Sequence, residues 1–160
     1  MKQLILLRHA KSSWDFPHLN DYERPLNDRG KRDAPKIAQW LSLQANNADL
    51  IITSGAERAK NTAIAFQAVL NVPMKIDDNL YHASRSKLLN QIKQTNNDIN
   101  CLILVSHNPG INDLADYLLS GFPENIPTTG IVSLKFDIEK WSEVSPKNVS
   151  LHFFQYPKNL

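Results

Sequence analysis

Arg8 and His9 directly follow a run of four aliphatic residues at positions 4–7, and this placement offers the clearest chemistry in the sequence. A run of this length and composition is typical of a strand that is buried on both faces of a sheet. In open α/β sheets, ligands bind beyond the carboxyl ends of such strands. We therefore interpret His9 as a candidate nucleophile and Arg8 as a candidate anion-binding group.

Two further apolar runs end at residues that can hold a phosphate. Residues 50–53 are followed by a segment that ends in Arg58, and residues 101–105 are followed closely by His107. The carboxyl ends of parallel strands can meet at one edge of a sheet, so these residues and the first pair are predicted to converge. His107 and Arg58 also have interpretations that involve no phosphate. His107 could be a core histidine bonded to backbone, and Arg58 could pair with an acid on its own helix.

Taken in order, these motifs resemble the signature of the histidine phosphatase superfamily, which also contains the cofactor-dependent phosphoglycerate mutases. Within the superfamily, the chain is similar to the short SixA-like group of phosphohistidine phosphatases. The resemblance runs from about residue 2 to residue 136. The segments that carry it are residues 8–15, 21–26, Asn27-Asp28-Arg29-Gly30, 54–59 with Thr62-Ala63, Ser106-His107-Asn108 and Pro127-Thr128-Thr129-Gly130.

The resemblance implies an α/β fold of the phosphoglycerate mutase-like type. This is a three-layer α/β/α sandwich whose central sheet is mostly parallel with an antiparallel edge. It also implies a phosphohistidine phosphatase, an enzyme that removes phosphoryl groups from phosphohistidine in proteins, phosphotransfer domains among them. In this interpretation the phosphoryl group passes through a phospho-His9 intermediate, and Arg8, Arg58 and His107 complete the catalytic set.

The residue types themselves support this chemistry. Phosphoryl transfer needs positive charge around three equatorial oxygens and a nucleophile in line with the leaving group. Arg8 and Arg58 can hold phosphate oxygens through their planar guanidinium groups, and His107 can donate a hydrogen bond to a third oxygen. Two nearby arginines would disfavour protonation of His9 and keep it in the reactive neutral form. Because the arginines supply the charge, we expect no metal and no cofactor.

Four further residues are expected to bind substrate. Asn108 follows the second histidine, and its backbone amide is expected near the phosphate. His82 is expected in a loop near the mouth of the pocket. Ser12 and Arg24 are expected to line the entrance, and the Arg-Pro-Leu setting of Arg24 resembles the family pattern. Trp14 is interpreted as a packing residue rather than a binding platform.

A general acid of the usual kind is missing from the sequence. In superfamily members that hydrolyse phosphate esters, the acid is an aspartate directly after the second histidine, or a glutamate between the second arginine and the second histidine. Here the first position is Asn108, and no glutamate occurs between Arg58 and His107. Imidazole leaves more easily than an alkoxide, because its conjugate acid titrates near neutrality. The sequence therefore favours phosphohistidine over a phosphate ester as the substrate.

Other functions stay open. A small-molecule phosphomonoesterase could use the same pocket, with Asp78 or a bound water as the acid. A mutase is less consistent with the sequence, because it has no evident acid with which to return the phosphoryl group. From a different class, the chain could be a non-catalytic phosphoprotein binder, although a binder would not need the nucleophile.

Composition is typical of a compact intracellular enzyme. The length of 160 residues predicts a single domain over residues 1–160. The basic residues at positions 24–36 alternate with acidic ones, so no nucleic-acid partner is expected. The apolar runs are too short to span a bilayer, and the N-terminus does not have a signal-peptide pattern. We therefore expect a cytoplasmic monomer without a membrane partner. Cys101 is the only cysteine and lies in an apolar run, so neither a disulfide nor a reactive thiol is expected.

Strands and helices are predicted to alternate along the chain in βαβ units. Strands are expected over residues 4–7, 50–53, 74–77, 101–105, 131–138 and 149–156, the last two as an antiparallel pair of edge strands. Helices are expected over residues 28–44, from 57 to about 70, over 86–94 and from 109 to a stop at Gly121. Pro35 would begin or bend the first helix. Ser54 and Glu57 form a capping-box pattern for the second, and Asn108 with Pro109 would begin the last.

Overall fold

The computed structural model describes residues 1–44 and 47–160. Its strands are β1 (Lys2–Arg8), β2 (Leu50–Thr53), β3 (Met74–Ile76), β4 (Cys101–Ser106), β5 (Ile131–Phe136) and β6 (Val149–Gln155). Its α-helices are α1 (Asp28–Ser42), α2 (Glu57–Leu70), α3 (Arg85–Lys93) and α4 (Gly110–Leu118). The helices and strands expected from the sequence are all present, with small differences at their ends.

The strands form one mixed sheet in the order β3-β2-β4-β1-β5-β6. The pairs β1–β4, β2–β4 and β2–β3 are parallel, whereas β5 runs antiparallel to both β1 and β6. The predicted mostly parallel sheet with an antiparallel side is therefore confirmed. The expectation of two edge strands is wrong for β5, which pairs on both sides and is buried along nearly its whole length. The edge on that side is β6.

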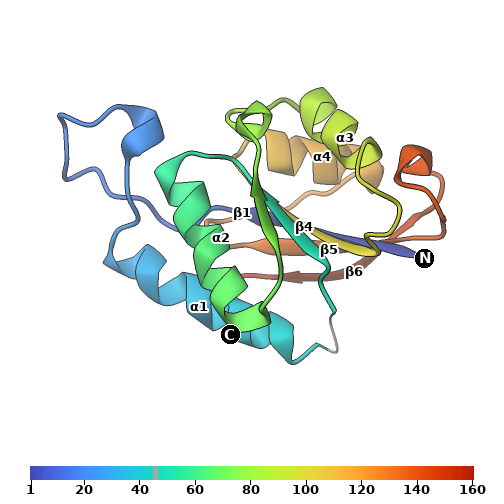
Figure 1. Cartoon of the computed structure of the whole chain (residues 1–160), viewed down its shortest axis with the longest axis horizontal. Coiled ribbons are helices and arrows are strands. Elements are labelled where there is room, and N and C mark those ends of the chain that lie inside the picture. The colour runs from blue at the N-terminus through green and yellow to red at the C-terminus, as the bar shows by residue number, and fades with distance from the viewer. Residues whose placement is uncertain (45–46) are drawn as a thin grey trace.

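Alternate residues of β1 face opposite layers of helices. Leu4 and Leu6 belong to the apolar cluster that contains the buried side chains of α3 and α4, and Ile5 and Leu7 belong to the cluster that contains those of α1 and α2. Figure 1 shows the sheet lying between these two pairs of helices. A strand covered on both faces needs apolar side chains at every position, which explains the continuous aliphatic run. The predicted three-layer α/β/α sandwich is confirmed.

The first helix begins at its predicted residue and continues through a proline. The Asn27 side chain accepts a hydrogen bond from the backbone amide of Gly30 at 2.9 Å, which caps the first turn of α1. Pro35 lies inside α1, so it does not mark the beginning of the helix. The predicted apolar face is confirmed, because the buried residues include Ala34, Ile37, Ala38 and Leu41.

The capping box predicted for the second helix is wrong. Ala56 is the N-cap residue of α2, and no side chain caps this end. The Ser54 hydroxyl instead lies 2.8 Å from Nε2 of His107, a residue of another strand end. A local cap has thus been replaced by a long-range contact, which a local sequence pattern cannot reveal.

The predicted beginning of the last helix is displaced by one residue. α4 begins at Gly110 with Pro109 as its N-cap, whereas the sequence predicts Asn108 as the cap. The Asn108 side chain still accepts a hydrogen bond from the backbone amide of Asn112 at 3.0 Å, so it satisfies one amide of the first turn. The stop at Gly121 is consistent with the structure, since this residue has a φ of 124° soon after the helix ends.

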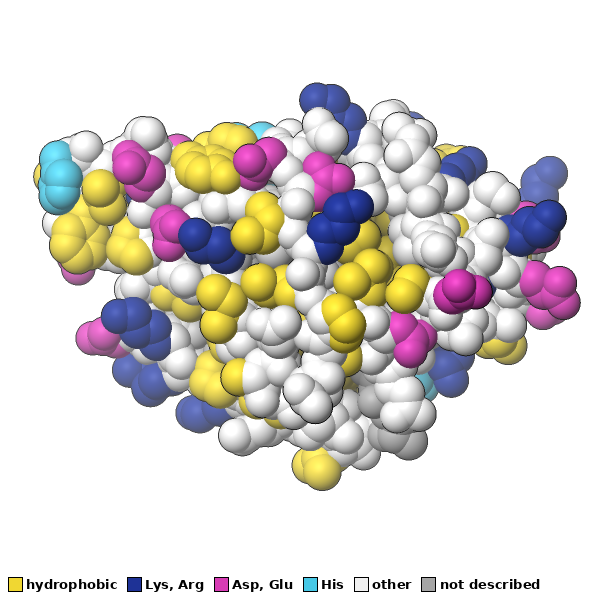
Figure 2. Space-filling model, viewed as in Figure 1, with side chains coloured by type: hydrophobic (Ala, Val, Ile, Leu, Met, Phe, Trp, Pro, Cys, Tyr) yellow, Lys and Arg dark blue, Asp and Glu magenta, His cyan; other side chains and the backbone are white. Residues whose placement is uncertain are grey.

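Several large apolar side chains are exposed at the surface. Within the described residues, no helix combines the length and the apolar character needed to cross a membrane. Figure 2 shows apolar side chains on the loop at the left of the view and over α2 and β3. The large exposed apolar residues on these segments are Trp14, Phe16, Ile64 and Ile76.

Candidate active site

The carboxyl ends of three neighbouring strands carry the candidate catalytic residues. β4 lies between β1 and β2, and β1 pairs with β4 up to Arg8 and Ser106. His9 and His107 follow these two strands, and their ring centroids are 5.2 Å apart. Arg58 lies in the first turn of α2, the helix that follows β2. The structure therefore brings together the residues that the sequence predicts to converge.

The ring of His9 is fixed in orientation by its own backbone. Its Nδ1 lies 2.8 Å from the carbonyl oxygen of Ala10, which can only accept, so Nδ1 carries the proton and Nε2 carries the lone pair. The backbone amide of Ala10 donates to the Thr62 hydroxyl at 2.8 Å, and that hydroxyl donates to the carbonyl of Arg58 at 2.6 Å. The nucleophile segment and the second arginine are thus joined through one hydroxyl. Nε2 is the nitrogen of His9 that is available to attack.

Ser54 fixes the orientation of His107. Nε2 of His107 lies 2.8 Å from the Ser54 hydroxyl, which also accepts a hydrogen bond from the backbone amide of Ala56 at 3.2 Å. The hydroxyl can therefore use its own proton to donate to Nε2, and this leaves the imidazole proton on Nδ1. The core-histidine alternative does not describe His107, because its partner is a side chain at another strand end.

Four buried side-chain atoms of the described residues lack a hydrogen-bond partner, and all four belong to one region. They are Arg8 Nε, Arg58 Nε, His107 Nδ1 and Thr129 Oγ1. Thr129 contacts the nucleophile segment, since its backbone amide donates to the carbonyls of Arg8 and His9, each at 3.1 Å. Its φ of 61° is rare for a β-branched residue, and such strain is concentrated at functional sites. Buried polar atoms are almost always paired, so this cluster indicates the place of a polar ligand.

Burial keeps both histidines neutral. It is the main cause that lowers the pKa of His9 to about 3; the backbone hydrogen bond opposes it, and the charges of Arg58, Arg8 and Arg24 lower the pKa further. Burial also lowers the pKa of His107 to about 2, with added effects of His9 and Arg58. The expectation that arginines keep His9 neutral is therefore correct in direction, but burial is the larger cause.

We expect the protein to lose stability as the pH falls from about 6.5 towards 3. Each histidine has an ordinary pKa of 6.5 and a folded value of about 3 or 2, so in this window the unfolded chain takes up protons that the folded protein does not. Each group then contributes a slope of up to about 1.4 kcal/mol per pH unit. Denaturant unfolding at a series of pH values measures this slope. It should become shallower in His107→Asn, and an unchanged slope would contradict the assignment.

Asp21 lies at the centre of the site, although the sequence does not predict a role for it. Its Oδ2 accepts hydrogen bonds from Arg58 Nη2 at 2.9 Å, the Tyr81 hydroxyl at 2.6 Å and His82 Nε2 at 3.0 Å. Its Oδ1 lies 3.3 Å from Nε of Arg24. Burial acts to raise the pKa of this carboxyl, but the hydrogen bonds from Tyr81 and Arg58 and the charge of Arg58 outweigh it and hold the pKa well below its ordinary value. Arg58 thus pairs with a distant loop, not with an acid on its own helix.

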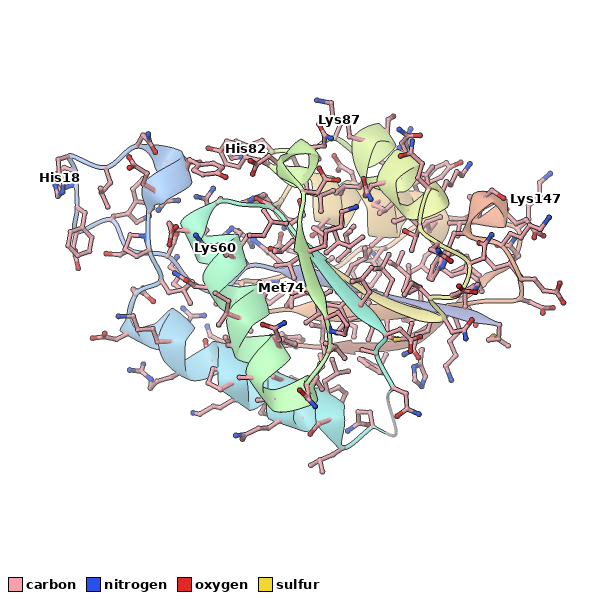
Figure 3. The ribbon with its side chains drawn as sticks, in the orientation of Figure 1. His18, Lys60, Met74, His82, Lys87 and Lys147 are labelled. Atoms are coloured by element: carbon pink, nitrogen blue, oxygen red, sulfur yellow. The ribbon has the colours of Figure 1, made fainter. Side chains whose placement is uncertain are left out.

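Two of the predicted substrate-binding residues, His82 and Arg24, contact the side chain of Asp21. His82 lies on the turn before α3, on the side that faces the short helical turn Asp21–Glu23 (Figure 3). The guanidinium of Arg24 lies over the ring of Trp14, 3.6 Å from its centroid. Trp14 is 74 % exposed, so it packs at the surface and not in the core. It is a surface ring on which an arginine of the site rests.

The other two predicted residues, Asn108 and Ser12, do not contact Asp21 through a hydrogen bond among those of the described residues. The Asn108 side-chain amide donates to the carbonyl of Ile126 at 3.1 Å, and the same carbonyl accepts a hydrogen bond from Arg8 Nη1 at 2.9 Å. Asn108 and Arg8 are therefore held by the same backbone carbonyl. Ser12 is joined to Leu26 by an isolated backbone bridge and is buried. That it lines the entrance of the pocket stays a prediction.

Two other side chains, those of Asp78 and Cys101, limit the chemistry that is available. Asp78, the alternative acid, is exposed, and its Oδ1 accepts a hydrogen bond from the Tyr22 hydroxyl at 2.7 Å. Burial, with the nearby charge of Asp49, raises the pKa of Cys101 to about 12, so this thiol stays protonated. Within residues 1–44 and 47–160, no group of three or more His, Cys, Asp or Glu side chains is arranged to hold a metal ion.

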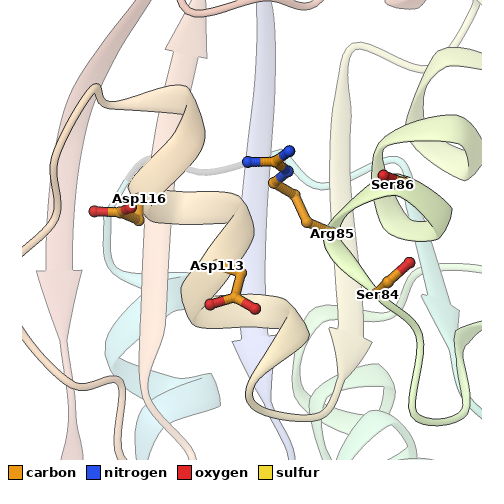
Figure 4. Close-up of a pocket in the computed structure, with 5 residues that line it drawn as sticks. All are labelled: Ser84, Arg85, Ser86, Asp113 and Asp116. Carbon is orange, nitrogen blue, oxygen red and sulfur yellow. The ribbon is translucent and has the colours of Figure 1, made fainter.

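A separate pocket lies between α3 and α4 (Figure 4). Its volume is about 330 Å³, and its lining residues are Ser84, Arg85, Ser86, Asp113 and Asp116. Arg85 lies over the ring of Tyr117, 4.5 Å from its centroid. Acidic and basic groups are both present in this pocket.

The sequence of this chain is similar to those of known proteins. Residues 4–84 match the sequence pattern of the histidine phosphatase superfamily, branch 1. The chain belongs to this superfamily. An uncharacterized chloroplastic protein of Arabidopsis thaliana is 33 % identical over 153 residues, which cover 89 % of this chain and 70 % of the plant protein. An uncharacterized protein of Mycobacterium tuberculosis is 29 % identical over 162 residues, which cover 95 % of this chain and 100 % of that protein.

Solved histidine phosphatase structures share the fold. A protein of Agrobacterium tumefaciens, proposed to be the phosphohistidine phosphatase SixA, is 27 % identical with a TM-score of 0.84, and the match covers 98 % of both chains. The protein histidine phosphatase SixA in complex with tungstate also has a TM-score of 0.84, at 22 % identity and 98 % coverage of both chains. The phosphoglycerate mutase-like fold and the resemblance to the SixA-like group are confirmed. Membership of the superfamily supports a phosphatase.

Proposed function

We propose that this histidine phosphatase removes phosphoryl groups from phosphohistidine in proteins, without a metal ion, through an intermediate on Nε2 of His9. The observation that carries the proposal is the cluster of buried nitrogen donors without partners beside a histidine whose free nitrogen is Nε2. Arg8 Nε, Arg58 Nε and His107 Nδ1 come from three separate elements, so each can donate to a different phosphate oxygen. The two guanidinium charges offset the charge on those oxygens in the transition state.

The reaction proceeds in two halves at the same phosphorus atom. In the first, the lone pair of His9 Nε2 forms a bond to phosphorus, while the bond to the substrate nitrogen breaks and its electron pair returns to the substrate imidazole. In the second, a water molecule attacks phospho-His9, and the pair of the broken bond returns to Nε2. Because the pKa of His9 is about 3, the nucleophile is neutral and ready throughout the neutral pH range.

The leaving group favours phosphohistidine over an ester. Position 108 is an asparagine, which is not an acid, and the exposed carboxylate of Asp78 already accepts a hydrogen bond from the Tyr22 hydroxyl. Imidazole needs less help to depart than an alkoxide does. The likeness to structures described as SixA phosphohistidine phosphatases supports a protein substrate.

A panel of phosphorylated compounds tests this proposal. We expect the highest activity on phosphohistidine in a protein or on phosphoramidate, weaker activity on p-nitrophenyl phosphate and the lowest on sugar phosphates or phosphoserine, because the leaving groups become steadily poorer. A chelator should change none of these rates. Equal rates on alkyl phosphates and phosphoramidate would favour the small-molecule phosphomonoesterase. Tight binding of phosphohistidine without turnover would favour the phosphoprotein binder.

A further inference from the structure

We propose that His82 is the proton donor to the leaving group, and that Asp21 holds its imidazole in place for this task. The inference rests on the proposed function, because in-line transfer to His9 defines where the leaving group must lie. A nucleophile and a leaving group occupy opposite sides of the transferred phosphorus. His9 is 8 % exposed and belongs to the buried side of the site. The leaving group, which arrives attached to a protein, therefore lies on the outer side.

His82 lies on that outer side and still contacts the catalytic set. Its side chain is 54 % exposed, and its ring centroid is 5.3 Å from that of His107. The Tyr81 ring packs against it at a centroid distance of 4.1 Å. In Figure 3, His82 lies at the outer edge of the molecule, at the turn that joins β3 to α3. A group in this position can meet both the solvent and a departing imidazole.

Of the polar groups around Asp21, His82 is the one suited to give up a proton. Asp21 stays ionised because its pKa is held well below the ordinary value. The Tyr81 hydroxyl donates a hydrogen bond to Asp21, and burial together with this hydrogen bond raises the pKa of the hydroxyl, so it is a poor acid. An imidazole can both give and take a proton near neutral pH. Nε2 of His82 lies 3.0 Å from Oδ2 of Asp21, which leaves Nδ1 of His82 as the nitrogen that exchanges protons.

The turn that carries His82 is fixed at both ends by residues of the site. The Ser106 hydroxyl donates to the carbonyl of Leu80 at 2.7 Å. At the other end, a Cβ atom on Gly110 would overlap the carbonyl oxygen of Ala83, so glycine allows the turn to lie against the start of α4. His82 itself has a φ of 50°, in the left-handed region that few non-glycine residues adopt. The turn thus holds one exposed histidine in a strained conformation beside His107.

The proton balance closes over the two halves of the reaction. His82 enters as the imidazolium, with Nε2–H on Asp21 and Nδ1–H directed to substrate. As the bond between phosphorus and the substrate nitrogen breaks, the substrate imidazole takes the Nδ1 proton, departs as a neutral molecule and leaves His82 neutral. When water attacks phospho-His9, Nδ1 takes one proton from the water. This restores the imidazolium and releases inorganic phosphate.

The variant His82→Asn tests the proposal. Asparagine tolerates a positive φ and can still donate a hydrogen bond to Asp21, but it cannot transfer a proton at neutral pH. We expect the loss in kcat/KM to be below about threefold on 2,4-dinitrophenyl phosphate and about hundredfold on phenyl phosphate, because a proton donor matters most for a poor leaving group. Phosphohistidine turnover should fall by roughly tenfold or more. His18→Asn makes the same change on an exposed loop and should leave every rate unchanged.

The outcomes separate this inference from the proposed function. An equal loss on all leaving groups would show that His82 only positions the substrate, and no loss would remove it from the mechanism; either result overturns the inference while leaving phospho-His9 intact. If the parent protein forms no phospho-His9 from phosphohistidine or from an aryl phosphate, the proposed function itself fails. Label trapped on His9 in His82→Asn, together with the graded loss, supports both.

Discussion

His9→Ala is expected to abolish turnover and, with it, the label that a phosphorylated substrate leaves on the protein. The reason is that Nε2 of His9 is the free nitrogen at the meeting point of the strand ends, while Nδ1 is held by the Ala10 carbonyl. Alanine keeps the backbone amide contacts of this segment but removes the nitrogen that is placed to form a bond to phosphorus. Rapid quenching with a labelled substrate, followed by mass spectrometry, measures the intermediate. In the parent protein the label should be acid-labile and base-stable, as a phosphoramidate is.

Two controls make the result specific. His18→Asn lies on the exposed loop and should keep both turnover and label. The fold of His9→Ala should also be intact by circular dichroism, since the segment is still held by Thr62 and Thr129 through backbone hydrogen bonds. Label found on a serine, or full activity in His9→Ala, would rule out the proposed mechanism.

The sequence predicts the framework of the site well, because the framework depends on patterns that are continuous along the chain. The apolar runs of β1, β2 and β4 are largely buried; β1 and β4 end directly before His9 and His107, and Arg58 lies in the first turn of the helix that follows β2. The fold then requires only that parallel strands share an edge, and this places His9, Arg58 and His107 together. The order of the motifs also indicates the superfamily, and the match of residues 4–84 to the histidine phosphatase pattern confirms it.

The residues that orient the catalytic groups could not be predicted in this way. Asp21 lies in a loop between two prolines, and a carboxylate is not expected beside a phosphate because like charges repel. Its role becomes visible only when Arg58 and His82 are found on either side of it. Ser54 has the local pattern of a cap, and the contact with His107 that replaces this cap spans 53 positions. The left-handed conformation of His82 gives no signal in the sequence at all.

Arg58→Ala is expected to lower kcat/KM by at least about a hundredfold, which corresponds to roughly 2.7–4 kcal/mol of transition-state stabilisation for a charged donor in a desolvated site. Arg58 is 3 % exposed and makes two hydrogen bonds to Asp21, so its guanidinium is already oriented before phosphate arrives. Arg58→Lys should recover little of the loss, because an ammonium cannot reproduce the planar arrangement of donors. Competitive inhibition by vanadate should weaken in parallel with activity in both variants.

A matched arginine and a chelator complete this test. Arg85→Ala removes an exposed arginine from the pocket between α3 and α4, and we expect it to leave kcat/KM and vanadate inhibition unchanged. Circular dichroism should show that Arg58→Ala is folded, since the Asp21 side chain is 42 % exposed and can be hydrated when its partner is removed. The parent protein should keep its activity in a chelator, because Arg8 and Arg58 supply the charge that a metal would otherwise supply. Activity that is lost in the chelator and restored by a divalent cation, or Arg58→Ala with parental kinetics, would show that the positive charge at the phosphate comes from another source.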